Sequence, residues 1–498
     1  MKIENNKYLA SRTGTVGVVG FGRTGRALLD FLLEQNEFKH IYLFNDTLIE
    51  GIEETTTRNN YETRGITFII GASEFPQLAD MELIILSPGV DGRTERFDQL
   101  REKGIKIISE IEFAFSFIKA PVIAITGTNG KSTTVSLIHH FLNKNGFNSF
   151  LTGNIGTPLI SEVKNIPDNA IVVVEVSSFQ LEEIHDFKPH IAAILNVTPD
   201  HLDRYHSLED YYNAKLNIGK NQQTNDYLIL NGNDSFLKEK EKDDKSLGAA
   251  RKVWFSRFRR SHDRHDTPDT SDAPDALNTH DTLDTSDSCA WLEDTNIHIK
   301  VDHIDDHISL RENPLRGVHN LENLLAAAAA ARLMGVSAAG IENAIKDFKG
   351  LPHRMELAGK IGNVEFINDS KATNIDASLK SIDSIDAPMV LILGGKDKGG
   401  DFTMLRESIK EKVGHVLLIG AAASTIHRQL VDIDNGERFI FVPDFTTAVA
   451  EGYRLLEKKG GVVLLAPGCA SFDMFKNFEH RGDVFTEEVQ KLKGRMHG

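Results

Sequence analysis

The sequence predicts an α/β fold of three consecutive domains. Short, continuously apolar runs alternate with helix-like stretches along most of the chain, as is typical of parallel strands covered on both faces. The length of 498 residues is too great for one core and fits about three domains of ordinary size. We expect these domains at residues 1–110, 111–350 and 351–498.

The first domain contains a glycine-rich turn after its first strand. We expect strands at 15–19, 41–44, 67–70 and 83–86, and a helix at 26–33. The turn Gly20–Gly25 (GFGRTG) follows the first of these strands, and Asp46 lies near the end of the second. This pattern predicts a diphosphate at a helix N-terminus. It does not distinguish a dinucleotide from a nucleotide sugar, and close strand–helix packing without a ligand stays open.

The second domain contains a phosphate-binding motif. We expect strands at 121–125, 170–174, 191–195 and 227–230, and a helix at 324–333. The segment Gly127–Thr133 (GTNGKST) lies between the first of these strands and an apolar helix, where backbone N–H groups can bind phosphate. Lys131 can reach the β- and γ-phosphates, and a hydroxyl of Ser132 or Thr133 can bind Mg²⁺. The usual spacing requires glycine where this chain has Ile125, so the loop is a shortened variant. A glycine-rich turn with a surface lysine is the alternative.

Two further strand ends of this domain carry candidate metal ligands. Glu175 ends one strand, and Asp200 and His201 follow the next. Ligands of α/β proteins bind at the carboxyl ends of parallel strands, and a carboxylate is the harder ligand for Mg²⁺. We therefore predict Glu175 and His201 as Mg²⁺ ligands.

One segment of the second domain differs from the rest. Arg259–Ser288 is rich in Asp, Thr, Ser and His and has almost no large apolar residue. Such a stretch cannot bury enough surface to offset the entropy of ordering it, so we expect a disordered insertion. A metal-binding tract of Asp and His is the alternative.

The third domain places polar loops after its strands. We expect strands at 364–367, 389–393, 416–419 and 462–465. The loops are Asn368–Asn374, Gly394–Gly400 and Pro467–Asp473. Each alone would be an ordinary turn. Together with Arg354, Lys371 and Lys398, which bring positive charge, they favour an anionic ligand.

Composition excludes several classes of function. Fifty-six Lys and Arg against 72 Asp and Glu give a net charge of −16, which argues against coating nucleic acid or an anionic membrane. Two cysteines, Cys289 and Cys469, cannot form a disulfide framework or a zinc site. No apolar run approaches the roughly 20 residues needed to span a bilayer, and no signal core is present. We expect a cytoplasmic protein.

A series of motifs occurs in a characteristic order. They are GTNGKST at 127–133, Gly153–Gly156, Glu175–Leu181, Asn196–Asp203, His319–Asn323 and Asn368–Asn374. This set resembles the Mur ligase family, and its last motif resembles the branch that adds D-glutamate. The resemblance covers the chain apart from the Asp-rich insertion. It implies a Rossmann-like N-terminal domain that binds a UDP substrate, a central P-loop ATPase, and a Rossmann-like C-terminal domain that helps to bind the amino acid.

The resemblance implies an ATP-dependent amide ligase. Its substrates would be UDP-N-acetylmuramoyl-L-alanine and D-glutamate, its intermediate an acyl phosphate, and its pathway the synthesis of peptidoglycan precursors. It further implies ATP, two Mg²⁺ ions and a monomer.

The resemblance also implies roles for individual residues. The catalytic set is Lys131, His201, Lys215, Arg354 and Lys371. The ATP-binding set is Gly127, Thr128, Asn129, Gly130, Lys131, Ser132, Thr133, Asn320, Asn323, Arg354 and Asp369. The UDP-substrate set is Arg23, Thr24, Asp46, Thr47, Ser87, Gly89, Asn154, Ser177 and His201. The D-glutamate set is Thr373, Lys398, Ser471 and Phe478, and the metal set is Ser132, Glu175, His201 and, if carbamylated, Lys215.

Two of these assignments carry qualifications. From the residues alone, Lys215 would be a surface lysine on a helix. The loop Leu48–Glu50, on the uracil side, departs most from the family pattern.

Four alternatives differ in what they explain. A sister Mur ligase or a folylpolyglutamate synthetase-like ligase would carry a different sequence at 368–374. An NAD-dependent oxidoreductase would explain Gly20–Gly25 but leave the P-loop and the third domain unexplained. A non-catalytic nucleotide-binding regulator would lack phosphate or metal groups, yet Lys131, Glu175, His201 and Arg354 are all present.

Overall fold

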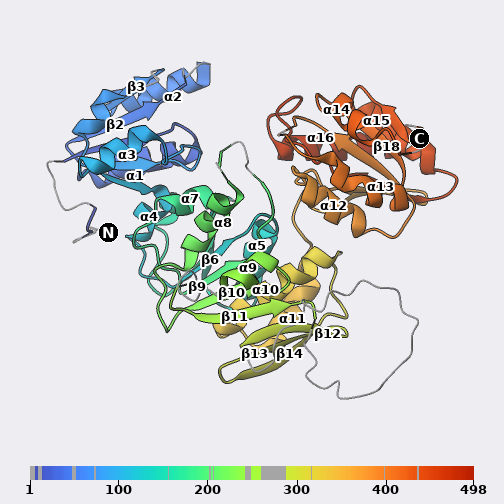
Figure 1. The fold of residues 1–498 in the computed structure, drawn as a ribbon, viewed down its shortest axis with the longest axis horizontal. Coiled ribbons are helices and arrows are strands. Elements are labelled where there is room, and N and C mark those ends of the chain that lie inside the picture. Colours follow the sequence, from blue (N-terminus) through green and yellow to red (C-terminus); the bar gives the residue numbers. More distant parts are fainter. Residues whose placement is uncertain are drawn as a thin grey trace. The chain divides into compact units, whose positions relative to one another are not determined.

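A computed structural model describes most of the chain and divides it into two compact units (Figure 1). The described residues are 6–8, 14–47, 52–71, 75–154, 156–200, 204–205, 207–241, 248–258, 288–315, 317–397, 399–433 and 437–497. The first unit is Met1–Arg311 with Glu322–Ile345, and the second is Glu312–Leu321 with Lys346–Gly498. Most of the predicted insertion, residues 259–287, and the loop Leu48–Glu50 lie outside the described residues.

The N-terminal sheet of the first unit is wholly parallel. Its order is β3-β2-β1-β4-β5. The strands are β1 (Thr15–Val19), β2 (His40–Asn45), β3 (Ile66–Ile70), β4 (Leu83–Leu86) and β5 (Lys106–Ser109). The helices are α1 (Arg23–Gln35), α2 (Ile52–Thr63), η1 (Pro76–Asp80) and α3 (Glu95–Glu102). Because the strand order reverses at β1, the turn Gly20–Gly25 lies at the switch point of the sheet, where ligands of such folds bind.

The central sheet has nine strands in the order β14-β13-β12-β11-β10-β9-β6-β8-β7. They are β6 (Val122–Thr126), β7 (Ser149–Gly153), β8 (Ile171–Glu175), β9 (Ile191–Ile194), β10 (Tyr227–Asn231), β11 (Arg251–Ser256), β12 (Cys289–Glu293), β13 (Asn296–Val301) and β14 (Ile304–Ser309). Neighbouring strands from β7 to β12 in this order are parallel, whereas β13 is antiparallel to both of its neighbours, β12 and β14.

Helices connect and flank these strands. They are α4 (Glu110–Phe115), α5 (Lys131–Lys144), α6 (Leu159–Glu162), α7 (Ser178–Glu182), α8 (Leu208–Leu216), η2 (Asn217–Gly219), α9 (Ser235–Glu241), α10 (Val318–Leu333) and α11 (Ala338–Asp347). One apolar core continues from the N-terminal sheet to the central sheet, from Val16 and Val18 to Val122 and Ala124. Glu112, buried in α4, accepts hydrogen bonds from Tyr8 Oη (2.6 Å) and Phe187 N (2.8 Å). These contacts join the two sheets into one unit.

The second unit is built on a six-stranded sheet in the order β15-β16-β20-β17-β18-β19, with β15 alone antiparallel to its neighbour. The strands are β15 (Glu356–Ile361), β16 (Val364–Asn368), β17 (Met389–Gly394), β18 (Val413–Ile419), β19 (Phe439–Phe441) and β20 (Gly461–Leu465). The helices are α12 (Ile375–Asp383), η3 (Phe402–Leu405), α13 (Arg406–Lys412), α14 (Ala423–Leu430), α15 (Phe445–Leu456) and α16 (Phe478–His497). Val390 and Ile392 belong to one core and Leu391 and Leu393 to another, so helices cover both faces of this sheet.

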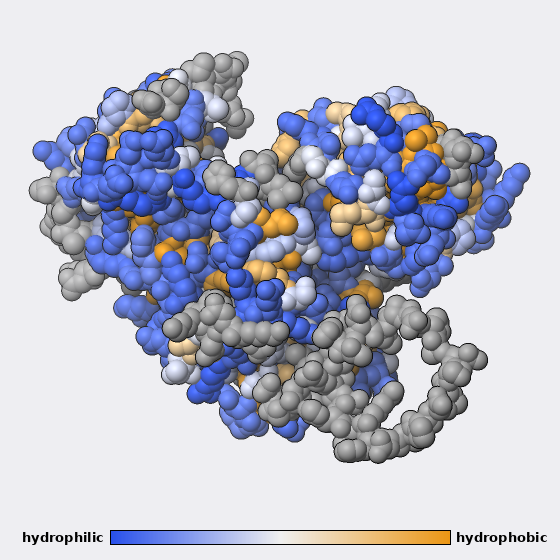
Figure 2. Space-filling view, viewed as in Figure 1, coloured by the Kyte–Doolittle hydropathy of each residue, from blue (hydrophilic) through white to orange (hydrophobic). Residues whose placement is uncertain are grey.

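The predicted fold class is confirmed. Each predicted apolar run forms a strand, while eight strands, β5, β7, β11 to β15 and β19, were not predicted. In β13, buried and more exposed positions alternate, so its sequence has no continuous apolar run. The face of the molecule seen in Figure 2 is largely hydrophilic, as the acidic composition leads one to expect. Among the helices of the described ranges, none is long and apolar enough to cross a membrane.

Candidate active site

The segment Gly127–Thr133 forms a tight loop between β6 and α5, as the sequence predicts. Gly127 has φ 152° and Gly130 has φ 88°. A Cβ atom at Gly130 would lie 2.3 Å from Asn323 Oδ1 in α10. Both the backbone angle and this close approach therefore require glycine at 130. Because α5 begins at Lys131, a helix N-terminus, the arrangement that binds phosphate, lies at the end of this loop.

Two lysine side chains meet at the carbonyl oxygen of Gly127. Lys131 Nζ donates to Gly127 O (2.7 Å) and Thr128 O (2.8 Å), and Lys215 Nζ in α8 donates to Gly127 O (3.1 Å). Lys215 is 2% exposed and lies over the ring of Tyr211. Burial, and next the charge of Lys131, lower the pKa of Lys215 well below its ordinary value. The interpretation of Lys215 as a surface lysine is thus wrong.

Glu175 presents a buried oxygen that has no hydrogen-bond partner among the residues that the structure describes. Its side chain, at the end of β8, is 2% exposed, and Oε1 accepts a hydrogen bond from Asn154 Nδ2 (2.8 Å). Oε2 is buried with no hydrogen-bond partner among the described residues. A buried carboxylate oxygen in this state is costly, and a hard divalent cation would compensate it. The carboxylate therefore fits the predicted Mg²⁺.

The described residues contain no group of three His, Cys, Asp or Glu side chains that could hold a metal ion. A bound Mg²⁺ usually takes few protein ligands and keeps several waters and phosphate oxygens. Ser132, the predicted hydroxyl ligand, is buried in the first turn of α5. His201, the other predicted ligand, lies outside the described residues.

A side chain that sequence reasoning did not single out fixes the loop in place. Asn196, which follows β9, accepts from Asn129 N at its Oδ1 (2.8 Å) and donates from Nδ2 to Asn129 O (3.0 Å). Its own carbonyl accepts from Thr128 N (2.9 Å), and Thr128 Oγ1 donates to Thr198 O (3.0 Å). The segment after β9 thus fixes Thr128 and Asn129 through hydrogen bonds of both its side chains and its backbone.

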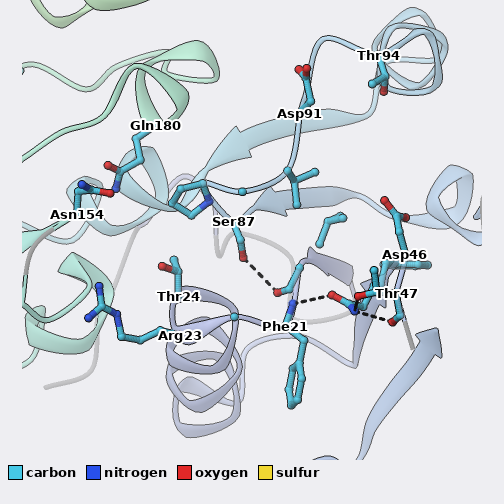
Figure 3. Close-up of a pocket in the computed structure, with 18 of the residues that line it drawn as sticks. Phe21, Arg23, Thr24, Asp46, Thr47, Ser87, Asp91, Thr94, Asn154 and Gln180 are labelled. Atoms are coloured by element: carbon cyan, nitrogen blue, oxygen red, sulfur yellow. Dashed lines mark hydrogen bonds between the residues drawn. The ribbon is translucent and has the colours of Figure 1, made fainter. Parts of the chain in front are cut away.

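A cavity of about 550 Å³ lies at the carboxyl ends of the N-terminal strands (Figure 3). Most of the predicted UDP-substrate residues line it: Arg23, Thr24, Asp46, Thr47, Ser87, Gly89 and Asn154. Ser87 Oγ donates to Gly20 O (3.2 Å), and Phe21 N donates to Asn45 Oδ1 (3.0 Å), so the glycine-rich turn is fastened to both neighbouring strands.

The residues that line the cavity differ from the prediction in two ways. Ser177 does not line it, because its side chain caps α7 in a reciprocal capping box with Gln180. Gln180, Asp91 and Arg96 do line it and were not predicted. Gln180 lies within the motif Glu175–Leu181, where no role was assigned to it, whereas Asp91 and Arg96 lie outside the motifs.

In the second unit, the loop after β16 holds several predicted residues. Asp369 is buried; its Oδ1 accepts from Met355 N (3.3 Å), and Ser381 donates to its Oδ2. Burial raises the pKa of Asp369, against the opposing effect of these hydrogen bonds and of Arg354. Lys371 Nζ lies 5.3 Å from the ring centre of Phe478.

The remaining predicted residues divide between the units. Ser471 is buried and Thr373 half-buried, both in the second unit, whereas Lys398 lies outside the described residues. The helix α10 begins at Val318; its Asn320 belongs to the second unit and its Asn323 to the first. Thr134 Oγ1 donates to Asn323 Oδ1 (3.3 Å), which ties this predicted nucleotide residue to the P-loop helix.

Comparisons with known proteins agree along the chain. Residues 14–109 match the Mur ligase MurD-like N-terminal domain, 125–331 the Mur ligase middle domain, and 353–469 the Mur ligase glutamate ligase domain. UDP-N-acetylmuramoylalanine–D-glutamate ligase of Thermoanaerobacter sp. (strain X514) is 38% identical over 96% of this chain and 98% of that relative. The protein of the same name from Alkaliphilus metalliredigens is 36% identical over 99% and 100%.

Solved structures show the same fold. The UDP-N-acetylmuramate-alanine ligase of Thermotoga maritima superposes with a TM-score of 0.54 at 18% identity, covering 96% of this chain and all of that one. The N-terminal, central and C-terminal regions of the present chain each match a Mur ligase model, and its sequence matches relatives over nearly its full length. The chain therefore belongs to the Mur ligase family.

Proposed function

We propose that this chain is an ATP-dependent ligase that joins D-glutamate to the terminal carboxyl group of UDP-N-acetylmuramoyl-L-alanine. Relatives that carry this activity in their names match nearly the whole chain. One observation supports the assignment most strongly: Asn154 lines the cavity and also donates to Glu175. A sugar nucleotide in the cavity would therefore extend toward the same carboxylate that suits a metal ion beside the P-loop.

The chemistry explains why such a site needs several cations. A carboxylate is a poor electrophile, so transfer of the γ-phosphoryl group of ATP to the alanyl carboxylate first gives an acyl phosphate and ADP. The amine of D-glutamate attacks the acyl carbon, and the tetrahedral intermediate expels phosphate to leave the amide. Lys131 and the N-terminal N–H groups of α5 offset the negative charge of the triphosphate while it approaches a second anion.

We propose Glu175 and Ser132 as the residues that hold one Mg²⁺, and His201 with a carbamylated Lys215 as those that hold a second. When bound, Mg²⁺ neutralises charge on the transferring phosphoryl group. The lowered pKa of Lys215 supports carbamylation, because only the neutral amine reacts with carbon dioxide. Without carbamylation, the amine of Lys215 donates a hydrogen bond to Gly127 O, as the amine of Lys131 does.

We also propose roles for residues between positions 320 and 478. We assign Arg354 to the phosphates, Asp369 to the ribose, and Asn320 and Asn323 to the nucleotide. We assign Lys371 to the reacting groups, and Thr373, Lys398, Ser471 and Phe478 to D-glutamate. Arg23, Thr24, Asp46, Thr47, Ser87 and Gly89 would hold the UDP part, with Asn154, Ser177 and His201 toward the acyl end. We further propose that the ligase acts as a monomer in the cytoplasm.

A coupled assay tests this function. Purified protein is incubated with ATP, MgCl₂, UDP-N-acetylmuramoyl-L-alanine and one amino acid at a time, and both phosphate and the amide product are measured. We expect stoichiometric phosphate and amide with D-glutamate, and little of either with L-glutamate, L-lysine or meso-diaminopimelate. Efficient turnover with another amino acid would assign the chain to a different branch of the family.

A further inference from the structure

One buried arginine joins three loops of the second unit. Arg481, in the first turns of α16, is 2% exposed. Its Nε donates to Ser370 Oγ (2.9 Å) and its Nη2 to Ser370 O (2.7 Å), both in the loop after β16. Its Nη1 donates to Cys469 O (3.0 Å) in the loop after β20. The loop after β17 also approaches it, since a Cβ at Gly395 would lie 3.2 Å from Nη1.

The surrounding hydrogen bonds make this junction rigid. Ser370 Oγ also donates to Phe478 O (2.8 Å), and Asn368 Nδ2 donates to Gly482 O (3.0 Å), so the start of α16 is fixed to the loop after β16. Thr373 and Ser471, two residues proposed for D-glutamate, lie a few positions along the chain from these anchors. A shift of Arg481 would therefore move both sides of the proposed amino-acid pocket.

The charge of Arg481 has no acidic partner within the described part of the chain. Its three acceptors, Ser370 Oγ, Ser370 O and Cys469 O, are neutral oxygens. Asp473 acts on it electrostatically, but its carboxylate accepts a hydrogen bond from Ala421 N (2.9 Å). Burial lowers the pKa of Arg481 to about 10, so the guanidinium still carries its proton at neutral pH. A buried cation without a carboxylate is costly, and its field is weakly screened.

We propose that Arg481 is a positioning residue that makes the amino-acid pocket selective for a dicarboxylic substrate. Its hydrogen bonds hold the loops after β16 and β20 in register, and its unpaired positive charge favours the side-chain carboxylate of D-glutamate over a neutral group of the same size. This inference rests on the proposed function, because it takes D-glutamate as the amino acid.

The test separates the effect of the positive charge of Arg481 from the effect of its side-chain shape. In the complete enzyme, Arg481→Gln removes the charge and Arg481→Lys keeps it, while Arg495→Gln removes the same charge from an exposed position of the same helix. For each, kcat/KM is measured with D-glutamate and with D-glutamine, a neutral isostere, and KM is measured for ATP and the UDP substrate. Thermal unfolding shows whether each variant is folded, and Arg481→Met replaces the Gln variant if that one does not fold.

We expect Arg481→Gln to lower the preference for D-glutamate over D-glutamine by roughly tenfold, which corresponds to about 1.4 kcal/mol. KM for ATP and for the UDP substrate should stay within about twofold, and Arg481→Lys should recover most of the preference. An unchanged preference in the charge-free variant, or an equal rise of all three KM values, would overturn the proposal. Wild-type enzyme that does not couple D-glutamate would instead overturn the proposed function.

Discussion

Replacement of Asn196 by alanine tests whether the P-loop is held in its binding conformation by the segment after β9. The change removes two hydrogen bonds to the backbone of Asn129, at 2.8 and 3.0 Å, and leaves the backbone bond from Thr128 N to residue 196 in place. The loop can then sample other conformations, and ATP must bear the free-energy cost of ordering it.

The magnitude follows from these two bonds. Each contributes about 1 kcal/mol net, so their loss amounts to about 2 kcal/mol. If that full amount falls on nucleotide binding, kcat/KM for ATP drops by about thirtyfold, since 1.4 kcal/mol corresponds to a factor of ten. KM for the UDP substrate should change little, because Asn196 does not line the cavity.

The assay measures kcat and KM for each substrate, together with the free energy of unfolding in urea. Asn221→Ala is the matched control, because Asn221 Nδ2 also donates to two backbone carbonyls of the first unit, His185 O (2.8 Å) and Phe187 O (3.1 Å). We expect similar losses of stability in both variants but a raised KM for ATP only in Asn196→Ala. Equal ATP kinetics in the two variants would show that Asn196 does not hold the P-loop in its binding conformation.

Further predictions concern single ionisable groups. Lys131→Ala should abolish phosphate release but leave binding of the UDP substrate, measured by calorimetry, nearly unchanged; undiminished turnover would contradict the P-loop assignment. Lys215→Ala should lower kcat by at least about a hundredfold, with partial recovery on adding formate or acetate, as expected for loss of a general charge-stabilising group; full activity without rescue would remove Lys215 from the site. Glu175→Gln should raise the MgCl₂ concentration needed for half-maximal rate, and an unchanged requirement would show that the orphaned oxygen is not a metal ligand. Burial raises the pKa of Glu110 from 4.5 to about 7, so its favourable contribution to stability is complete below pH 4.5 and is lost as pH rises through about 7. The substitution Glu110→Gln should remove up to about 3 kcal/mol of this pH dependence, measured as the free energy of unfolding in urea at pH 5 and pH 8. Identical pH profiles of the variant and the wild-type protein would contradict the buried-carboxyl assignment.

The fold was predictable where local sequence determines it. Buried parallel strands such as Val122–Thr126 appear as continuous apolar runs, and glycine-rich turns mark where α1 and α5 begin. The hairpin strands β13 and β14 were among those missed, because more and less exposed positions alternate along them and leave no continuous apolar run.

Within the site, only the residues that belong to a motif or a strand end were predictable. Lys131 and Glu175 stand at positions that a motif or a strand end marks. The burial of Lys215 depends on its contact with Gly127, 88 residues earlier, and no local pattern reports it. Arg481 is one arginine in a polar helix, and its role arises from loops that the fold brings to it.

In the proposed reaction, ATP activates the substrate carboxyl group by phosphorylating it. The direct test uses UDP-N-acetylmuramoyl-L-alanine with oxygen-18 in its carboxylate, together with ATP, Mg²⁺ and D-glutamate, and analyses the phosphate released by mass spectrometry. An acyl phosphate predicts one labelled oxygen in each phosphate formed with amide product. Unlabelled phosphate accompanying the same amide would show that the carboxyl group is not phosphorylated.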